Sequence, residues 1–387
     1  MPLSWYAFLR RMIPNFFYSP AILKYDFGPQ HPLKPERLRR TIELLERYGL
    51  ESIDPGPGSD ADPLRVHDEE YVRAVEIIDK QISGSPSPFR GGEARGEGPG
   101  RPSAFLLKEY GFGGGDNPAF PGMYEASLAY TSATARAAEK VRDGAPLAFG
   151  IGGGLHHAHK DRASGFCIFD DPAVACHILR ERFDKVAYVD IDVHHGDGVQ
   201  WLFYHDPTVL TCSIHEDGRT LFPGSGSCDQ TGVDYSSFNV PIQAHTTGDV
   251  WFDAFERTIL PALERFKPEA IVLQLGTDTH FLDPLGNLRC AQQDWLTAAK
   301  RIKDLGLPLV AVGGGGYEIT TVPRMWTSAV LTLSNVPYAD EVPEDLAKQW
   351  GMPFFSDHQE PTPRKVGREH AEGVIAWLEK HHLPNIH

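Results

Sequence analysis

Acidic residues and histidines alternate in the segment 189–198, which reads VDIDVHHGDG and continues the apolar run 186–189. If the strand geometry persists, Asp190, Asp192 and His194 project to one side, because alternate strand residues do so. Carboxylate oxygens and neutral imidazole nitrogens suit Zn²⁺ or Fe²⁺, and three protein ligands with one open position are typical of a catalytic metal site. The segment is therefore predicted to supply two metal ligands, with a third from elsewhere. The alternative, a polar loop with solvated histidines, is disfavoured by the apolar flank and the dense acids.

Two adjacent histidines, His156 and His157, follow three glycines after another apolar run. Histidine is the natural general acid or base near neutral pH. Asp190 and Asp197 remain to hydrogen-bond the far ring nitrogens, which would fix the tautomers and raise the basicity. We predict the pairs Asp190 with His156 and Asp197 with His157. The alternative is two structural histidines within the core.

Two further runs end in residues that complete this chemistry. Asp278 ends the run 274–278, QLGTD, and is predicted to be the third metal ligand; the alternative is an N-cap of the next helix. Tyr317 follows four glycines at 313–316, but no Gly-Lys-Ser/Thr follows, so a phosphate loop is disfavoured. We predict that its hydroxyl donates to a developing oxyanion, the alternative being an ordinary buried tyrosine.

Together these residues predict metal-assisted amide hydrolysis. A divalent ion lowers the pKa of its water from about 16 towards about 7 and polarises a carbonyl. One histidine takes the water proton, and another proton goes to the leaving amine.

Short apolar runs alternate with segments of helical character, which predicts an α/β fold with a mostly parallel central sheet and helices on both faces. We expect a single large domain. The predicted strands are 146–151, 186–190, 209–214, 269–275 and 308–312, and the predicted helices include 126–141, 172–182, 251–266 and 292–305. Ligands of such sheets bind beyond the carboxyl ends of the strands. The segments expected to converge there are 152–159, 190–197, 215–226, 276–284 and 313–317.

The 387 residues are predicted to comprise an N-terminal extension, 1–20, and one domain, 21–387. The segment 83–103 is rich in Gly, Pro, Ser and charge. Such a composition buries too little apolar surface to offset the entropy of ordering, so we expect a flexible insertion within the domain.

The amino-acid composition narrows the classes of binding partner and the cellular compartment that we expect. The formal net charge of −15 argues against nucleic-acid and membrane binding, which need clustered basic residues. Five cysteines without a Cys-x-x-Cys pair are typical of reduced thiols in a cytoplasmic protein. No apolar run approaches the about 20 residues that span a bilayer. The apolar stretch 5–17 is interrupted by Arg10, Arg11 and Pro14, so a signal peptide is not expected.

In this order, the motifs resemble the histone deacetylase superfamily, which has the arginase/deacetylase-like α/β fold. The matching segments are 152–171 (GGGLHHAHKDRASGFCIFDD), 189–200 (VDIDVHHGDGVQ), 213–226 (SIHEDGRTLFPGSG), 274–287 (QLGTDTHFLDPLGN) and 313–326 (GGGGYEITTVPRMW). The segments 25–38, 66–72 and 116–127 resemble the bacterial acetoin-utilisation deacetylases in particular. The resemblance runs from about Tyr25 to Trp326, the insertion excepted.

The resemblance implies a set of site residues. Zinc, or Fe²⁺ in its place, would be held by Asp192, His194 and Asp278, with His156 and His157 as catalytic histidines and Tyr317 as the oxyanion-binding residue. Phe166 and Phe222 would line an acyl-lysine tunnel, with Gly165 accepting from the substrate amide, Leu285 near the rim and Asp116 holding the substrate backbone. A potassium ion would lie beside Asp190, Asp192 and Ser213. We also expect His280 to narrow the mouth or to contact substrate.

The implied function is a zinc-dependent lysine deacetylase, a hydrolase that removes acetyl (acyl) groups from lysine side chains of proteins. The implied partner is an acetylated protein, with acetyl-CoA synthetase as a candidate. The main alternative is an amidohydrolase of acetylpolyamines or other small acylated amines. A binding module without turnover and a two-manganese ureohydrolase are weaker alternatives.

Overall fold

The computed structural model describes residues 15–84, 102–359 and 361–387. Among these residues, six strands form one parallel sheet in the order β1-β6-β5-β2-β3-β4. The strands are β1 (Leu147–Gly150), β2 (Val186–Asp190), β3 (Val209–Glu216), β4 (Ser237–Ile242), β5 (Ala270–Gln274) and β6 (Leu309–Val312). The predicted α/β domain with a parallel central sheet is thereby confirmed.

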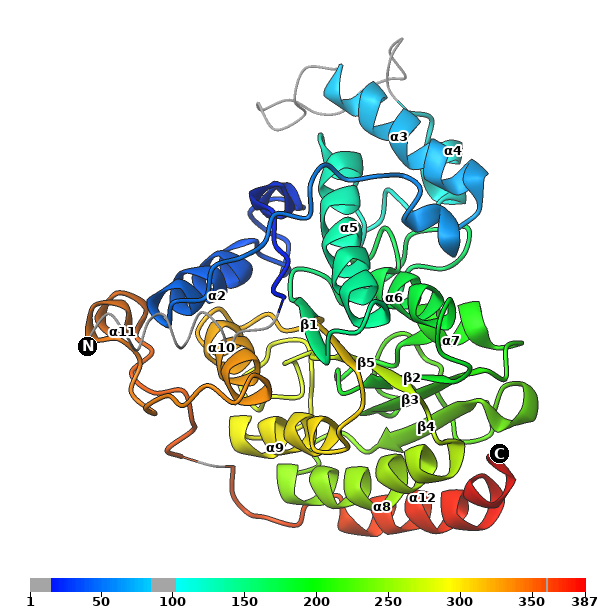
Figure 1. Cartoon of the computed structure of the whole chain (residues 1–387), viewed down its shortest axis with the longest axis vertical. Helices are drawn as coiled ribbons and strands as arrows, with labels where there is room; N and C mark the ends of the chain where they lie inside the picture. The colour runs from blue at the N-terminus through cyan, green and yellow to red at the C-terminus, as the bar shows by residue number, and fades with distance from the viewer. Residues whose placement is uncertain (1–14, 85–101, 360) are drawn as a thin grey trace.

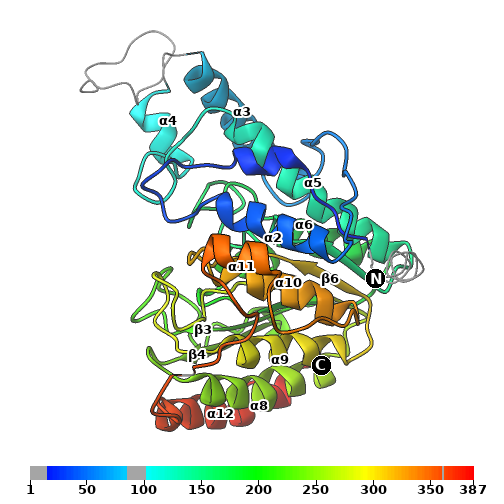
Figure 2. The same cartoon turned by 90° about the vertical axis from the view of Figure 1, so that its left-hand side faces the viewer.

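Helices cover both faces of the sheet. Figure 1 shows α5, α6 and α7 on one side and α8, α9 and α12 on the other. The helices are α2 (Glu36–Arg47), α3 (Glu69–Ser83), α4 (Ala104–Glu109), α5 (Met123–Arg142), α6 (Asp171–Arg180), α7 (Asp197–Phe203), α8 (Gly248–Phe266), α9 (Gln292–Lys303), α10 (Val322–Leu333), α11 (Glu344–Trp350) and α12 (Arg368–His381). Figure 2 shows α3 and α4 at the end of the molecule opposite α12. None of the described helices combines the length and the hydrophobicity that a membrane span requires.

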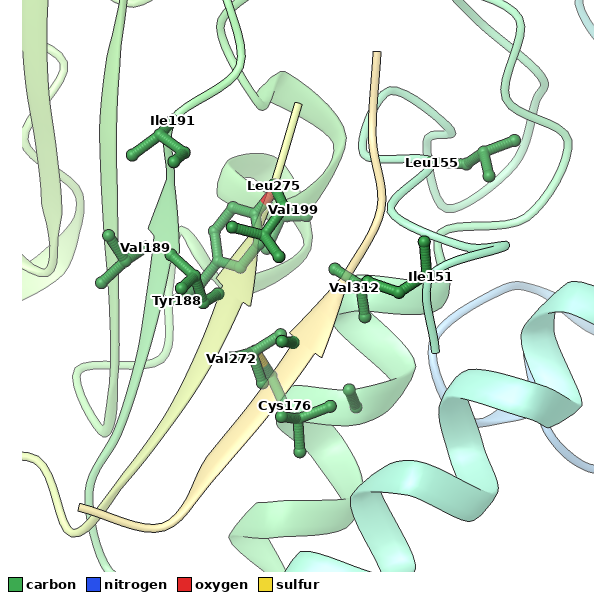
Figure 3. Close-up of a cluster of buried hydrophobic side chains, with 14 of the residues drawn as sticks. Ile151, Leu155, Cys176, Tyr188, Val189, Ile191, Val199, Val272, Leu275 and Val312 are labelled. Atoms are coloured by element: carbon green, nitrogen blue, oxygen red, sulfur yellow. The ribbon is translucent and has the colours of Figure 1, made fainter. Parts of the chain in front are cut away.

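The central strands β2 and β5 are mainly apolar because helices cover both faces of the sheet, and each ends in a single polar residue, Asp190 or Gln274. Every residue of β2 and β5 is buried. Figure 3 shows Tyr188 and Val272, which are paired across these strands, on the side of the sheet where Cys176 of α6 lies. Helix α6 begins where the Asp170 side chain accepts from the Ala173 N–H, with Pro172 in the first turn.

The sixth strand, β4, is absent from the sequence-based prediction. Its sequence, SFNVPI, contains an asparagine and a proline and has no continuous apolar run. It lies at the edge of the sheet, where Pro241 is tolerated because an edge strand pairs on one side only. Strand β3 pairs with β4 as far as Glu216, so it ends two residues later than predicted.

Parts of the predicted extension and insertion lie outside the described residues, namely 1–14 and 85–101. Within the extension, Phe16 and Phe17 are buried, and Phe16 forms a parallel bridge with Phe149 of β1. Of the insertion, Ser83 ends α3 and Ser103 caps α4 by accepting from the Leu106 N–H. The division into extension, domain and flexible insertion remains a prediction.

Parallel strands place their carboxyl ends at one edge of the sheet, and the loops that begin there carry the predicted site residues. The loop after β1 carries His156 and His157, and the loop after β2 carries Asp192 and His194. The loops after β3, β5 and β6 carry Phe222, Asp278 and Tyr317. The fold thus brings together side chains that are up to 161 positions apart in the chain (156 to 317).

Candidate active site

Asp192, His194 and Asp278 form a compact group of buried ligand atoms. One atom from each lies within 4.8 Å of the other two, and this is the group of metal-ligating side chains found among the described residues. His194 Nδ1 lies 3.1 Å from Asp192 Oδ1 and 3.1 Å from Asp278 Oδ2. Ligands about 2.0–2.1 Å from a tetrahedral zinc are about 3.3 Å apart, so these separations fit a zinc ion.

Backbone and side-chain donors orient the two carboxylates. Asp192 Oδ2 accepts from Gln274 Nε2 at 2.8 Å and from the Gly315 N–H at 2.7 Å. Asp278 Oδ1 accepts from the Val193 N–H at 2.9 Å. The other oxygen of each carboxylate is therefore turned towards His194. Such outer contacts fix metal ligands in place.

The charge of the cluster also favours a cation. Burial and the neighbouring Asp192 carboxylate raise the pKa of Asp278 to about 7. Two buried carboxylates side by side need a compensating positive charge, which a divalent ion would supply. The residues present therefore fit a divalent metal.

The two adjacent histidines each contact a buried aspartate. His156 Nδ1 donates to Asp190 Oδ2 at 2.7 Å, and His157 Nδ1 donates to Asp197 Oδ1 at 2.6 Å. Their Nε2 atoms face each other at 3.1 Å. Tyr188 Oη also donates to Asp190 Oδ2, at 2.7 Å. These contacts leave the two Nε2 atoms hydrogen-bonded to each other, so that a proton can be shared between the rings beside the metal cluster.

The two histidines differ in basicity. Burial lowers the pKa of His156, but the Asp190 and Asp192 charges outweigh burial and raise it to about 9. Burial and the nearby His156 lower the pKa of His157 to about 4. In the metal-free protein near neutral pH, His157 is therefore the neutral member of the pair and His156 the protonated one.

The glycine-rich loop that carries Tyr317 is held from two sides. The buried Arg37 guanidinium donates to the carbonyls of Gly314 and Gly316, both at 2.8 Å. A Cβ on Gly315 would lie 2.0 Å from Asp278 Oδ2, so only glycine allows this close approach. The loop packs against the metal cluster, and burial together with the nearby charges of Asp278 and Asp192 raises the pKa of half-buried Tyr317 well above its usual value.

Phe166 and Phe222 lie on the outer side of these groups. The Phe166 ring is edge-on to the Tyr317 ring, with centroids 5.7 Å apart. The Phe222 ring is 41 % exposed and edge-on to the His157 ring at 5.0 Å. A Cβ on Gly165 would lie 2.5 Å from the His157 ring and 2.8 Å from Phe222, so the backbone passes close to both.

The remaining predicted residues lie around this centre. Exposed Asp116 accepts through its backbone carbonyl from His31 Nε2 at 3.2 Å, and the His31 ring packs on Phe166 at 4.4 Å. Half-buried Leu285 lies on the loop after β5. Ser213 pairs in register with Asp190 across β3 and β2.

The prediction that His280 narrows the mouth or contacts substrate is wrong. Its side chain has no exposed surface, and its Nε2 lies 2.9 Å from Asp357 Oδ2. Arg324 pairs with the other oxygen of Asp357 at 2.5 Å. His280 instead holds the C-terminal segment against the loop after β5, which a reading of local sequence could not anticipate because Asp357 is 77 positions away.

Asp283 is a site residue that the sequence analysis missed. This buried carboxylate accepts from the Tyr317 N–H at 2.7 Å and from the Leu285 N–H at 2.9 Å. It thereby joins the loop after β5 to the loop that carries Tyr317. Its one signal in the sequence is the Asp-Pro pair at 283–284, which is typical of any turn. Arg37 and Gln274 were also missed, because the contacts that tie them to this site, with Gly314, Gly316 and Asp192, are long-range.

Comparisons with known proteins give the family. The family model for the histone deacetylase domain matches residues 31–333. The chain is 35 % identical over 350 residues to the acetoin utilization protein AcuC of Bacillus subtilis, covering 87 % of this chain and 86 % of that protein. It is 33 % identical over 341 residues to the histone deacetylase clr6 of Schizosaccharomyces pombe, covering 84 % and 79 %.

A solved structure shares the fold over almost the whole chain. The crystal structure of an HDAC homolog complexed with SAHA superposes with a TM-score of 0.82 at 25 % identity, covering 94 % of this chain and 98 % of that one. The predicted resemblance, including its likeness to the acetoin-utilisation proteins, is confirmed. This chain belongs to the histone deacetylase family.

Proposed function

We propose that this chain is a zinc-dependent deacetylase that removes acetyl groups from lysine side chains of proteins. Family membership makes it a hydrolase that acts on amides. The observation that supports the finer assignment is the cluster of Asp192, His194 and Asp278, with paired histidines and a tyrosine at the same edge of the sheet.

The side chains divide the reaction between them. A dication held by the cluster would supply Lewis acidity to the amide carbonyl and to a water molecule. Neutral His157, oriented by Asp197, accepts the proton of the attacking water. The Tyr317 hydroxyl donates to the oxyanion that develops on the carbonyl. The C–N bond then breaks as the leaving nitrogen takes a proton from an imidazolium. Protonated His156 is the proposed donor of this proton.

Phe166 and Phe222 support a lysine-like substrate. Apolar walls favour the methylene stem of an acyl-lysine, while the amide at its tip meets the polar groups below. Exposed Asp116 contacts His31, which packs on Phe166, and its carboxylate would accept from substrate backbone N–H groups. A small acetylpolyamine has a similar stem but no peptide backbone, so it remains the second candidate.

Substrate preference separates these two candidates. We expect kcat/KM on an acetyl-lysine peptide to exceed that on N-acetylputrescine by at least about tenfold, since a charge-assisted backbone contact contributes about 1.5–3 kcal/mol. Steady-state kinetics with both substrates measure the ratio. Asp116→Asn should lower kcat/KM on the peptide and leave that on N-acetylputrescine unchanged. A preference for the small amine would reject the protein-lysine assignment.

Asp283 gives a test of how Tyr317 is positioned. Asp283→Asn replaces one acceptor oxygen by a donor, so it cannot accept from both Tyr317 and Leu285 N–H groups. We expect kcat to fall about tenfold with KM within about twofold, consistent with one lost charge-assisted bond. In a Tyr317→Phe background the same change should have little further effect, because the hydroxyl it positions is gone. Equal losses in both backgrounds would show that Asp283 does not act through Tyr317.

We further propose a potassium ion beside Asp190, Asp192 and Ser213, where it would offset part of the negative charge behind the metal cluster. Fe²⁺ is the alternative to zinc, since the same oxygen and nitrogen donors suit both. We propose a cytoplasmic protein, supported by five free cysteines. An acetylated protein, with acetyl-CoA synthetase as a candidate, is the proposed partner, and neither nucleic acid nor membrane is proposed as one.

A further inference from the structure

Asp197 contacts a third histidine through its second carboxylate oxygen. Its Oδ1 lies 2.6 Å from His157 Nδ1, and its Oδ2 lies 3.5 Å from His159 Nε2. The Asp197 side chain is 6 % exposed, whereas that of His159 is 16 % exposed. Asp197 and His159 thus connect the buried histidine pair to the surface.

The backbone of His159 is firmly held. His67 Nδ1 donates to the His159 carbonyl at 2.9 Å, and His67 Nε2 accepts from the Asp170 N–H at 2.8 Å. The His159 N–H donates to the Arg162 carbonyl at 2.9 Å. The ring therefore starts from a fixed point beside Asp197, unlike a histidine on a free surface turn.

The outer side of His159 lines a surface groove, together with His205. Two cations of that groove have carboxylate partners of their own. Lys160 pairs with Asp68 at 2.9 Å, and Arg162 pairs with its neighbour Asp161 at 3.0 Å. Of the basic side chains in this turn, it is His159 that reaches Asp197.

We propose that His159 is a positioning residue, whose Nε2–H donates to Asp197 and thereby holds the carboxylate that orients His157. A carboxylate with one strong partner can turn about its Cβ–Cγ bond, and a second donor on the other oxygen restricts that rotation. The 3.5 Å separation is longer than an ordinary hydrogen bond, and contacts of catalytic groups often tighten only when substrate binds. This role rests on the proposed function, because it acts through His157.

His159→Phe keeps an aromatic ring but removes the donor. We expect kcat on an acetyl-lysine peptide to fall about threefold to tenfold with KM within about twofold, because a long, partly exposed hydrogen bond is worth less than a buried one. His159→Gln keeps an N–H donor and should recover kcat to within about twofold of the wild type. His205→Phe, in the same groove, should leave kcat unchanged.

Two further measurements separate positioning from a general structural role. In an Asp197→Asn background, His159→Phe should cause no further loss, whereas the same fold-loss there would overturn the proposal. The downfield proton resonance of His157 Nδ1–H, identified by its loss in Asp197→Asn, should shift or broaden in His159→Phe and recover in His159→Gln. This resonance reports on His159 even if the wild type fails to deacetylate the peptide, which would reject the proposed function alone. An unchanged resonance would overturn the role of His159.

Discussion

Replacing Asp278 by Asn is expected to release the bound dication and to lower kcat/KM on an acetyl-lysine peptide by at least about 10³-fold. The substitution removes one of two carboxylates that face His194 Nδ1, at 3.1 Å. The loss follows from the several kcal/mol that a bound Lewis acid contributes to the transition state. Elemental analysis and steady-state kinetics on the same preparation measure both effects.

Asp304→Asn is the matched control, because Asp304, directly after α9, is an exposed acid whose side chain pairs with Lys300 of that helix. It should leave metal content and rate unchanged, as surface substitutions usually do. Full metal content and full rate in Asp278→Asn would remove Asp278 from the ligand set. Two dications per wild-type chain would instead favour the two-metal ureohydrolase alternative.

Replacing Tyr317 by Phe is expected to lower kcat by about 10²–10³-fold, equivalent to about 3–4 kcal/mol, with little change in KM. The hydroxyl stabilises charge that develops only in the transition state, so substrate binding is not expected to depend on it. The loop should keep its conformation, since Arg37 and Asp283 hold it through backbone groups. Single-turnover and steady-state rates on an acetyl-lysine peptide measure the loss.

Tyr338→Phe is the control for loss of a hydroxyl away from the site. Tyr338 is half-buried, and its Oη lies 3.3 Å from Thr332 Oγ1. Its substitution should leave kcat unchanged. Undiminished turnover in Tyr317→Phe would contradict the role assigned to this tyrosine. Absence of turnover in the metal-loaded wild type would favour a binding module.

The sequence alone predicted which loops lie close together, because one rule about parallel strands is enough to place them. The apolar runs around Val189, Leu273 and Val312 are typical of strands buried on both faces, and parallel strands place all their carboxyl ends at one edge. Any polar residue directly after such a run must lie at that edge. Asp192, His194 and Asp278 could therefore be placed together without knowledge of the loops.

The tertiary structure alone decided the contacts that hold these groups. Each of three residues acts through a partner that lies 34 to 279 positions away in the chain: Asp283, Arg37 and His159. These residues or their partners lie in loops, where no periodic pattern predicts a contact. The edge strand β4 escaped prediction because its pairing with β3, and not its own apolar pattern, keeps it in the sheet. His280 was misassigned because a residue two positions after Asp278 can point outward or inward, depending on how the loop turns.

The residue types and the order of the strands thus allowed us to predict the chemistry of the site and its place at the carboxyl-terminal edge of the sheet. The side chain that each loop residue contacts was decided by packing between distant segments. Local sequence reports periodicity over a few residues, whereas a hydrogen bond between loops depends on two backbone paths that are set by the whole core.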